Sequence, residues 1–331
     1  MPIKKNIEGG GGGLWRRSYT LPTILIVMAL LGIVHLKGTY PLFGGEQVGS
    51  AINLTLDQMK TKDDDSDWEI KPLAIMKSRS QGFRPVYIYS NVTPDHMDQY
   101  SQEKQDQIIL ALTKANDIKA NLNPRVEPPF FVDLAANDAL VLSNTFFLEK
   151  NGWEGVCIEA NPEYWYRLAS FRTCTIIGAA VGGKPEDNGL EVNFALKGVL
   201  GGVVGHGTDN NEDNSANVVQ VKRNLVSILT IFNQTNVPKV IDYMSLDVEG
   251  AESMVMEHFP WSDYSFKFLT IERPKDDLKE KLKLNGYKMV LVLTLYGETL
   301  WIHQPSVLLP LEEIWTIAGE YNNTYFSRVI P

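Results

Sequence analysis

Two acidic side chains stand at the ends of apolar runs that are typical of buried strands. Asp133 lies in FFVDL (130–134), and Glu159 follows GVCI (155–158), 26 residues further along the chain. In doubly wound α/β folds, an acid at the end of the second strand accepts hydrogen bonds from ribose hydroxyl groups. Either acid alone could be a capping or surface carboxylate. Together, at this spacing, they indicate a site for a cofactor that carries a ribose.

The turn after the first strand lacks the glycines that are usual in such a site. It contains Ala135, Asn137, Asp138 and Ala139, whereas a chain that bends sharply beside a ligand usually carries glycine there. Alanine is the smallest replacement, and the polar residues around it are kept. We therefore expect a narrowed but usable site, with an ordinary negative φ at both alanines.

A second group of acids follows two later apolar runs. Asp247, Glu249 and Glu252 come directly after VIDYMSL (240–246), and Glu272 ends FKFLTIE (266–272). In a parallel sheet these strand ends meet at one edge, beside the cofactor. Activation of a hydroxyl group needs a base, or a divalent metal that lowers its pKa, and clustered carboxylates supply either. The alternative is that Asp247 and Glu249 cap the helix that starts near Gly250, and for Glu249 and Glu252 capping alone is as good an interpretation as catalysis.

Four other features have simpler interpretations. His206, in the polar stretch 201–217, could line a substrate lid, although a histidine in a loop is usually solvated. Trp153 and Trp165 are interpreted as packing residues rather than a sugar-binding platform. The chain has two cysteines and no Cys/His cluster of the kind that binds a metal.

Strand and helix patterns alternate from Phe130 onward. This order predicts an α/β fold, a doubly wound and mostly parallel sheet with helices on both faces. A short strand is also expected at 86–90. The predicted strands are 130–134, 155–160, 174–181, 240–248, 266–272, 288–295 and 298–303, and the predicted helices are 101–116, 144–150, 162–170, 223–234 and 276–287.

Several linked motifs resemble the FkbM-type methyltransferase family. They are FFVDLAANDALVLSNT, GWEG, IEANP, MSLDVEGAE and IERP, preceded by SQEKQD, and the resemblance covers residues 101–303. It implies a seven-stranded, Rossmann-like methyltransferase sheet that binds S-adenosylmethionine. By motif position, the cofactor lies along Asp133 and the 135–139 turn, the ribose binds Glu159, and Ala179 and Ala180 border the adenine. The residues expected to bind the cofactor are Asp133, Ala135, Asn137, Asp138, Ala139, Glu159, Ala160 and Asn161, and those expected in catalysis are Asp247, Glu249 and Glu272.

The N-terminus has the pattern of a membrane anchor. Residues 19–36 contain no charged side chain over 18 positions, and Lys4, Lys5, Arg16 and Arg17 precede them. A spanning helix needs about 17 to 25 apolar residues, and the basic flank keeps the N-terminus in the cytoplasm. A cleaved signal peptide is the alternative. We expect a cytoplasmic tail (1–18), an anchor (19–36), a stem (37–84), the methyltransferase domain (85–304) and a C-terminal extension (305–331).

This topology places the domain in the lumen of the secretory pathway, in the Golgi or the ER. Four N-x-S/T sequons, at Asn53, Asn91, Asn233 and Asn322, agree with a luminal glycoprotein. In an oxidising lumen Cys157 and Cys174, on neighbouring strands, could pair, and two free buried thiols are the alternative. The net charge of -9 argues against a nucleic-acid partner.

Two functions remain open on the sequence alone. The first is a membrane-anchored, S-adenosylmethionine-dependent O-methyltransferase whose acceptor is a glycan hydroxyl. The second is a non-catalytic, membrane-tethered binding or trafficking module on a degenerate methyltransferase fold. The alanines at 135 and 139 favour the second, whereas Asp133, Glu159 and Asp247 favour the first.

Overall fold

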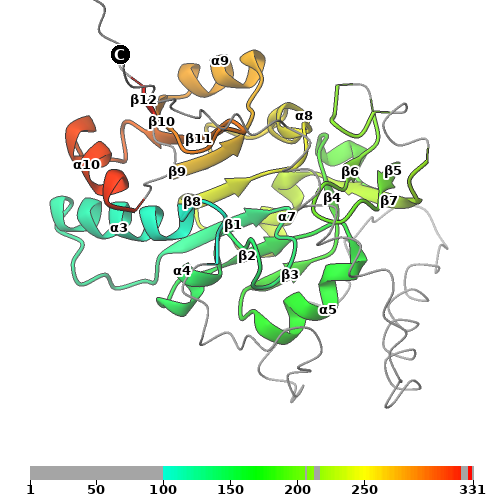
Figure 1. Ribbon diagram of the computed structural model, residues 1–331, viewed down its shortest axis with the longest axis horizontal. Helices are drawn as coiled ribbons and strands as arrows, with labels where there is room; N and C mark the ends of the chain where they lie inside the picture. The colour runs from blue at the N-terminus through cyan, green and yellow to red at the C-terminus, as the bar shows by residue number, and fades with distance from the viewer. Residues whose placement is uncertain (1–99, 206, 212–216, 322–326, 330–331) are drawn as a thin grey trace, which may run out of the picture. The chain divides into compact units, whose positions relative to one another are not determined.

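The computed structural model describes residues 100–205, 207–211, 217–321 and 327–329. Their main sheet has eight strands in the order β12-β10-β11-β9-β8-β1-β2-β3 (Figure 1). The bounds are β1 (Phe130–Leu134), β2 (Glu154–Ile158), β3 (Thr175–Ile177), β8 (Val240–Leu246), β9 (Ser265–Glu272), β10 (Tyr287–Val292), β11 (Glu298–His303) and β12 (Ser327–Arg328).

The sheet is mostly parallel, as predicted. Strands β3, β2, β1, β8 and β9 run parallel to one another, and β11 lies antiparallel between β9 and β10. The two-residue β12 adds one antiparallel edge strand to the seven that were expected. Because β11 is antiparallel, its first residue lies at the same edge as the last residue of β9.

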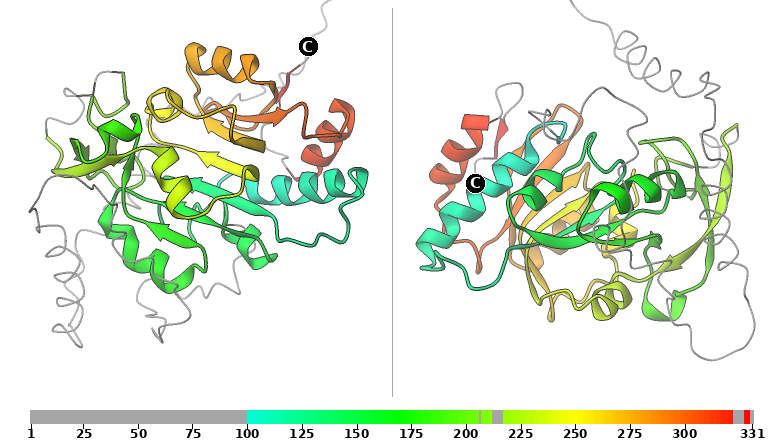
Figure 2. Two further views of the ribbon diagram at one scale, coloured as in Figure 1. Left: turned by 180° about the vertical axis from the view of Figure 1, so that it is seen from behind. Right: turned by 90° about the horizontal axis from the view of Figure 1, so that it is seen from below.

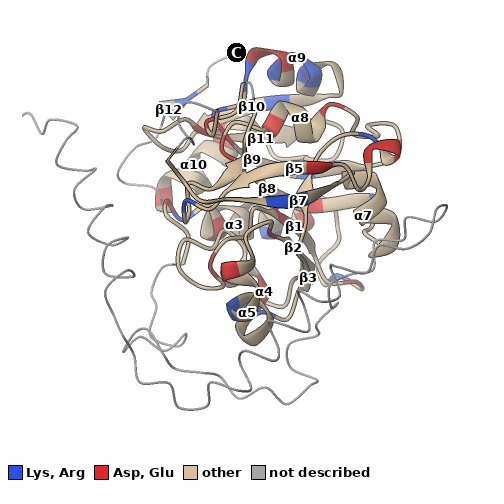
Figure 3. Ribbon diagram, turned by 90° about the vertical axis from the view of Figure 1, so that its right-hand side faces the viewer, with Lys and Arg blue, Asp and Glu red and all other residues tan. Residues whose placement is uncertain are grey.

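Helices cover both faces of this sheet, which confirms the doubly wound architecture (Figure 2). Alternate residues of β1 point to opposite faces: Phe131 packs in the apolar cluster of α3, α4, α5 and α10, and Val132 packs in that of α7, α8 and α9. On the solvent side α9 carries acids in its first turn and lysines in its last (Figure 3), which suits the helix dipole. The helices are α3 (Gln105–Lys119), α4 (Phe146–Lys150), α5 (Pro162–Phe171), α7 (Ile228–Gln234), α8 (Glu252–Met256), α9 (Asp276–Leu284) and α10 (Leu311–Tyr321), and η2 (Pro185–Asp187) is a 3-10 turn.

A second sheet, not predicted, is inserted between β3 and β8. It has the order β4-β7-β5-β6 and consists of β4 (Ala180–Val181), β5 (Glu191–Ala195), β6 (Gly202–Val203) and β7 (Gln220–Val226). The single strand predicted at 174–181 was therefore wrong, because it divides between the two sheets. It breaks at Gly178, where a Cβ would lie 2.6 Å from the Trp165 ring.

The helix predicted at 223–234 was wrong over its first part. Residues 223–226 belong to β7, and α7 begins only at Ile228 because Ser227 caps it, its hydroxyl accepting the Thr230 amide at 3.2 Å. Exposed and half-buried residues alternate along the first five positions of β7, and this alternation has the period of a strand.

A disulfide joins Cys157 of β2 to Cys174, which immediately precedes β3. Both side chains are buried in the core under α5. The choice between a bond and free thiols, open on the sequence, is thus resolved in favour of the bond.

Several predictions fall on residues that the structure does not describe. The anchor (19–36), the stem (37–84) and the strand at 86–90 lie outside the described residues, and so do His206 and the sequons at Asn53, Asn91 and Asn322. Among the helices that the structure describes, none has the length and apolar character needed to cross a bilayer. The Asn233 sequon lies on the surface at the end of α7.

Candidate active site

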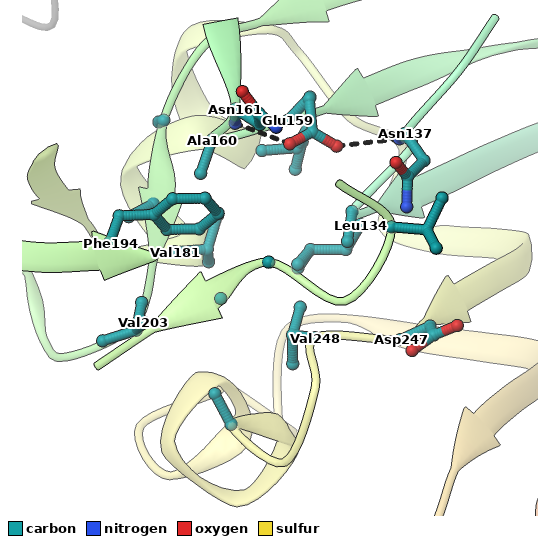
Figure 4. A pocket seen from close by; sticks show the side chains of 18 of the residues that line it. Leu134, Asn137, Glu159, Ala160, Asn161, Val181, Phe194, Val203, Asp247 and Val248 are labelled. Atoms are coloured by element: carbon teal, nitrogen blue, oxygen red, sulfur yellow. Dashed lines mark hydrogen bonds between the residues drawn. The ribbon is translucent and has the colours of Figure 1, made fainter. Parts of the chain in front are cut away.

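A cavity lies where the carboxyl ends of β1, β2 and β8 meet the second sheet (Figure 4). It holds about 560 Å³ of unfilled space, part of which is open to solvent. Phe194 of β5 points its ring into the cavity beside Ala160 and Val181 (Figure 4). The residues that line it are Leu134, Ala135, Asn137, Ile158, Glu159, Ala160, Asn161, Ala179, Ala180, Val181, Phe194, Gly198, Val199, Gly201, Gly202, Val203, Asp247, Val248 and Ala251.

Glu159 ties together the two turns that form the floor of this cavity. One carboxylate oxygen accepts the backbone amide of Asn137 at 2.8 Å, and the other accepts the amide of Asn161 at 2.6 Å. The side chain is only 5% exposed. Burial raises the pKa of Glu159 to about 7, and the negative charge of Asp133 adds a smaller increase. The hydrogen bonds from the two backbone amides act in the opposite direction and lower this pKa.

Three buried polar atoms on the cavity wall have no hydrogen-bond partner. They are Asn137 Oδ1, Asn161 Nδ2 and Asp247 Oδ1, each from the end of a different strand. A buried polar group without a partner costs about 1 to 3 kcal/mol, and such groups are rare in folded proteins. Three of them around one cavity indicate that it is built for a polar ligand with both donors and acceptors.

Three of the residues expected to bind the cofactor lie outside the cavity. Asp133 is buried and accepts the Thr145 hydroxyl at 2.5 Å, and burial raises its pKa while the nearby Arg172 lowers it. Asp138 pairs with Arg167 at 2.5 Å and accepts two backbone amides of its own turn. Ala139 is completely buried in the core. A direct contact of these three with a cofactor remains a prediction, whereas the other five line the cavity.

The backbone at Ala135 differs from the prediction. Its φ is +68°, in the left-handed region, because its amide and that of Ala136 both donate to the Ile158 carbonyl, at 3.0 and 3.1 Å. The expectation of a negative φ was therefore wrong at Ala135, while Ala139 is not among the residues with positive φ. A left-handed alanine costs about 1 to 2 kcal/mol.

We expect Ala135→Gly to stabilise the domain by about 0.5 to 1 kcal/mol. Removing the Cβ relieves the left-handed strain, and the greater freedom of glycine in the unfolded chain cancels part of that gain. Urea denaturation measures the difference. The matched control is Ala139→Gly, which removes a buried methyl group without any strain to relieve and should destabilise the domain. A loss of stability in Ala135→Gly equal to that in the control would contradict the argument.

The second acidic group forms a carboxylate centre, defined by Asp247, Glu249 and Glu272. Each offers one oxygen, and these oxygens all lie within 4.8 Å of one another. Burial, together with Glu272, Glu298 and Glu249, raises the pKa of Asp247 well above its usual value. Burial raises the pKa of Glu249 to about 7, and the negative charge of Glu272 makes the next largest contribution. Asp247 and Glu249 therefore hold a proton more tightly than exposed carboxyl groups do.

Sequence reasoning left capping and catalysis open for Glu252 and missed Glu298. Glu252 accepts the amides of Val248 at 3.2 Å and Gly250 at 3.1 Å, so it fixes the turn that precedes α8, and this helix has no side-chain cap. Glu298, the first residue of β11, pairs in register with Glu272, and its pKa is raised to about 8, chiefly by burial. An antiparallel last strand is the signal that could have placed it at this edge.

The two tryptophans pack as expected. Trp153 is buried in the core. Trp165 donates its indole N–H to the Glu159 carbonyl at 2.8 Å and packs against Gly178, so it supports the floor of the cavity from below.

A match to a known domain family agrees with this architecture. Residues 133–289 match the model of the methyltransferase FkbM domain. No curated protein sequence matches the chain significantly. Among solved structures, precorrin-6y C5,15-methyltransferase from Geobacter metallireducens GS-15 is 13% identical, with a TM-score of 0.29 over 62% of this chain and 92% of that one. The delta-N METTL16 MTase domain is 8% identical, with a TM-score of 0.26 over 58% of this chain and 80% of that one. The resemblance stated from the motifs is thus confirmed by the family match, and the chain contains a methyltransferase FkbM domain.

Proposed function

We propose that this chain is an S-adenosylmethionine-dependent O-methyltransferase. The observation that carries the proposal is that Asn137, Asn161 and Asp247, each with a buried polar atom that has no partner, line one cavity beside the buried Glu159 carboxylate. S-adenosylmethionine has ribose hydroxyls, an amino group and a carboxylate, which match the acceptors and donors of Glu159, Asn137 and Asn161, so that Asp247 is left for the acceptor. When bound, S-adenosylmethionine supplies an electrophilic methyl group.

The cofactor would be held by residues from the ends of β1 and β2. Glu159 would accept the ribose hydroxyls, because its carboxylate faces the cavity and is fixed by two backbone amides. Asn137 and Asn161 would bind the remaining polar groups. The small side chains Ala179 and Ala180, with Val181 and Phe194, form the apolar part of the wall.

Proton removal from the acceptor would fall to the carboxylate centre. Asp247 is the acid of the centre that lines the cavity, and burial, together with Glu272, Glu298 and Glu249, raises the pKa of its carboxyl group. A raised pKa makes the ionised carboxylate a stronger base, which favours general-base catalysis. Asp247 is therefore the residue that we assign to the base.

We propose further that the acceptor is a glycan hydroxyl and that the domain lies in the lumen. The charge-free run at 19–36 with its basic flank supports an anchor of this orientation. The buried Cys157–Cys174 disulfide supports an oxidising compartment. The surface position of the Asn233 sequon is compatible with glycosylation.

At a pH above the pKa of about 7, where the Glu159 carboxyl group is ionised, loss of its charge should weaken cofactor binding about tenfold. A hydrogen bond to a charged group contributes about 1.5 to 3 kcal/mol and a neutral one about 0.5 to 1.5, and a difference of about 1.4 kcal/mol is tenfold in affinity. Glu159→Gln keeps the size of the side chain and is compared with the parent by calorimetric titration with S-adenosylmethionine. Glu163→Gln, an exposed glutamate in the first turn of α5, is the matched control. Equal affinities of Glu159→Gln and the parent would remove Glu159 from the site.

One observation favours the second function, a non-catalytic binding module. Ala135 places a methyl group on the cavity wall in a strained conformation, where the cofactor would approach the chain. Calorimetric titration of both the parent and the Ala135→Gly variant with S-adenosylmethionine decides between the two functions. If neither the parent nor this variant binds S-adenosylmethionine, the binding module replaces the enzyme.

A further inference from the structure

The carboxylate centre already contains a cation from the chain itself. A single nitrogen of Arg273, Nη2, lies 2.6 Å from Asp209 Oδ2, 2.7 Å from Glu272 Oε2 and 3.2 Å from Glu249 Oε2. These acids come from three separate segments: the loop after β6, the turn after β8 and the end of β9. Their convergence on one positive atom resembles the way in which carboxylates surround a bound metal ion.

The backbone directs Arg273 into this position. Its φ is +44°, in the left-handed region, and its amide donates to the Gly297 carbonyl at 3.1 Å. A Cβ on Gly297 would lie 3.0 Å from Arg273 Cγ, so a side chain there would crowd the arginine stem. Glu249 also has a left-handed φ, +54°. Two strained residues, each costing about 1 to 3 kcal/mol, thus face each other across one ion pair.

We propose that the Arg273 guanidinium is the resident cation of the carboxylate centre and that it excludes a divalent metal ion. The oxygens of Asp247, Glu249 and Glu272, all within 4.8 Å of one another, have a spacing that suits one divalent ion. Two of the three are bound to Arg273. A guanidinium keeps its charge at every physiological pH, so it does not leave the centre by titration.

Arg273 is a positioning residue, because it contacts the acids of the centre rather than the cavity. It holds Glu249 and Glu272 together and ties the Asp209 loop to them, while Asp247 lines the cavity and its Oδ1 has no hydrogen-bond partner. It follows, on the function proposed above, that the acceptor hydroxyl is activated by carboxylates alone and that methyl transfer is independent of added metal.

The test is the binding of Mn²⁺ to the purified full-length chain, followed by electron paramagnetic resonance without S-adenosylmethionine. Arg273→Ala removes the guanidinium and should bind Mn²⁺ at least tenfold more tightly than the parent. Arg273→Gln keeps a planar polar group without charge and should show the same gain, which covers the case in which the alanine variant folds poorly. Adding Glu272→Gln to either variant should abolish the gain, because it removes one of the ligands.

Lys275→Ala is the matched control. Lys275 lies two residues away and donates to the carbonyls of Gly207 and Gly250 rather than to a carboxylate. Its loss should leave Mn²⁺ affinity at the parent value. Equal Mn²⁺ affinities of the parent and both Arg273 variants would overturn the proposal, and so would a gain that survives Glu272→Gln. Because no cofactor is present, this outcome is independent of the S-adenosylmethionine titration that tests the proposed function.

Discussion

Asp247→Asn is expected to lower the turnover number at least a hundredfold while changing the affinity for S-adenosylmethionine by less than about threefold. A positioned general base contributes about 10² to 10⁴ to a rate, and a group that acts only in the chemical step affects turnover rather than binding. Asn keeps the shape of the side chain and cannot take a proton. Transfer of a labelled methyl group to a panel of free oligosaccharides measures turnover, and calorimetric titration measures affinity.

The control for this prediction is an aspartate at the opposite edge of the sheet. Asp263 is exposed and lies just before the start of β9, so Asp263→Asn makes the same chemical change outside the site. Its turnover should equal that of the parent. A similar turnover in Asp247→Asn would leave Asp247 as a structural residue of the carboxylate centre.

Arg172→Ala is expected to destabilise the domain by about 3 to 5 kcal/mol. Arg172 is fully buried, and it donates to Glu149 at 3.0 Å and to the Thr145 hydroxyl at 2.7 Å, beside the buried Asp133. Removing one partner of a buried ion pair leaves uncompensated buried charge, which costs about this amount. Urea denaturation, followed by circular dichroism, gives the difference in the free energy of unfolding.

The comparison is Arg167→Ala, which breaks the ion pair with Asp138. That pair is partly exposed, with 27% of the Arg167 side chain accessible, so its loss should cost about 1 kcal/mol or less. If the two variants lose equal stability, burial does not set the strength of these pairs. Asp133 is fixed through Thr145 and Arg172, so a large loss in Arg172→Ala would also explain the SNT motif (143–145) as a structural support.

The main sheet was predictable because its signals are local. Each parallel strand is a short apolar run followed by a helix with its own period, and Glu159 follows its strand directly. The second sheet was not predictable in the same way. Its strands are short and partly polar, as in Glu191–Ala195, and they pair across long loops. That sheet brings Phe194 to the cavity, and nothing in the sequence around Phe194 indicates this role.

The errors at the site have a related cause. The left-handed φ of Ala135 is imposed by hydrogen bonds to Ile158, a residue 23 positions away, and tertiary contacts of this kind override the preference of alanine. Glu298 reaches the carboxylate centre only because β11 lies antiparallel beside β9, and Arg273, which directly follows β9, is held by its amide bond to Gly297, the residue just before β11. Such neighbours become visible when the order and direction of the strands are known.

The acidic residues at the edge of the cavity affect how strongly the site holds the cofactor before the reaction and the product after it. In the enzyme that we propose, the cofactor arrives with a positive sulfonium and leaves, after methyl transfer, as a neutral thioether. The acids of this region outnumber the guanidinium among them, since Asp209, Glu249 and Glu272 pair with Arg273 and Asp247 lies beside them. The resulting negative potential attracts the cationic cofactor more strongly than the neutral product. The carboxylate centre would therefore reduce product inhibition, and this selectivity should weaken as the salt concentration rises.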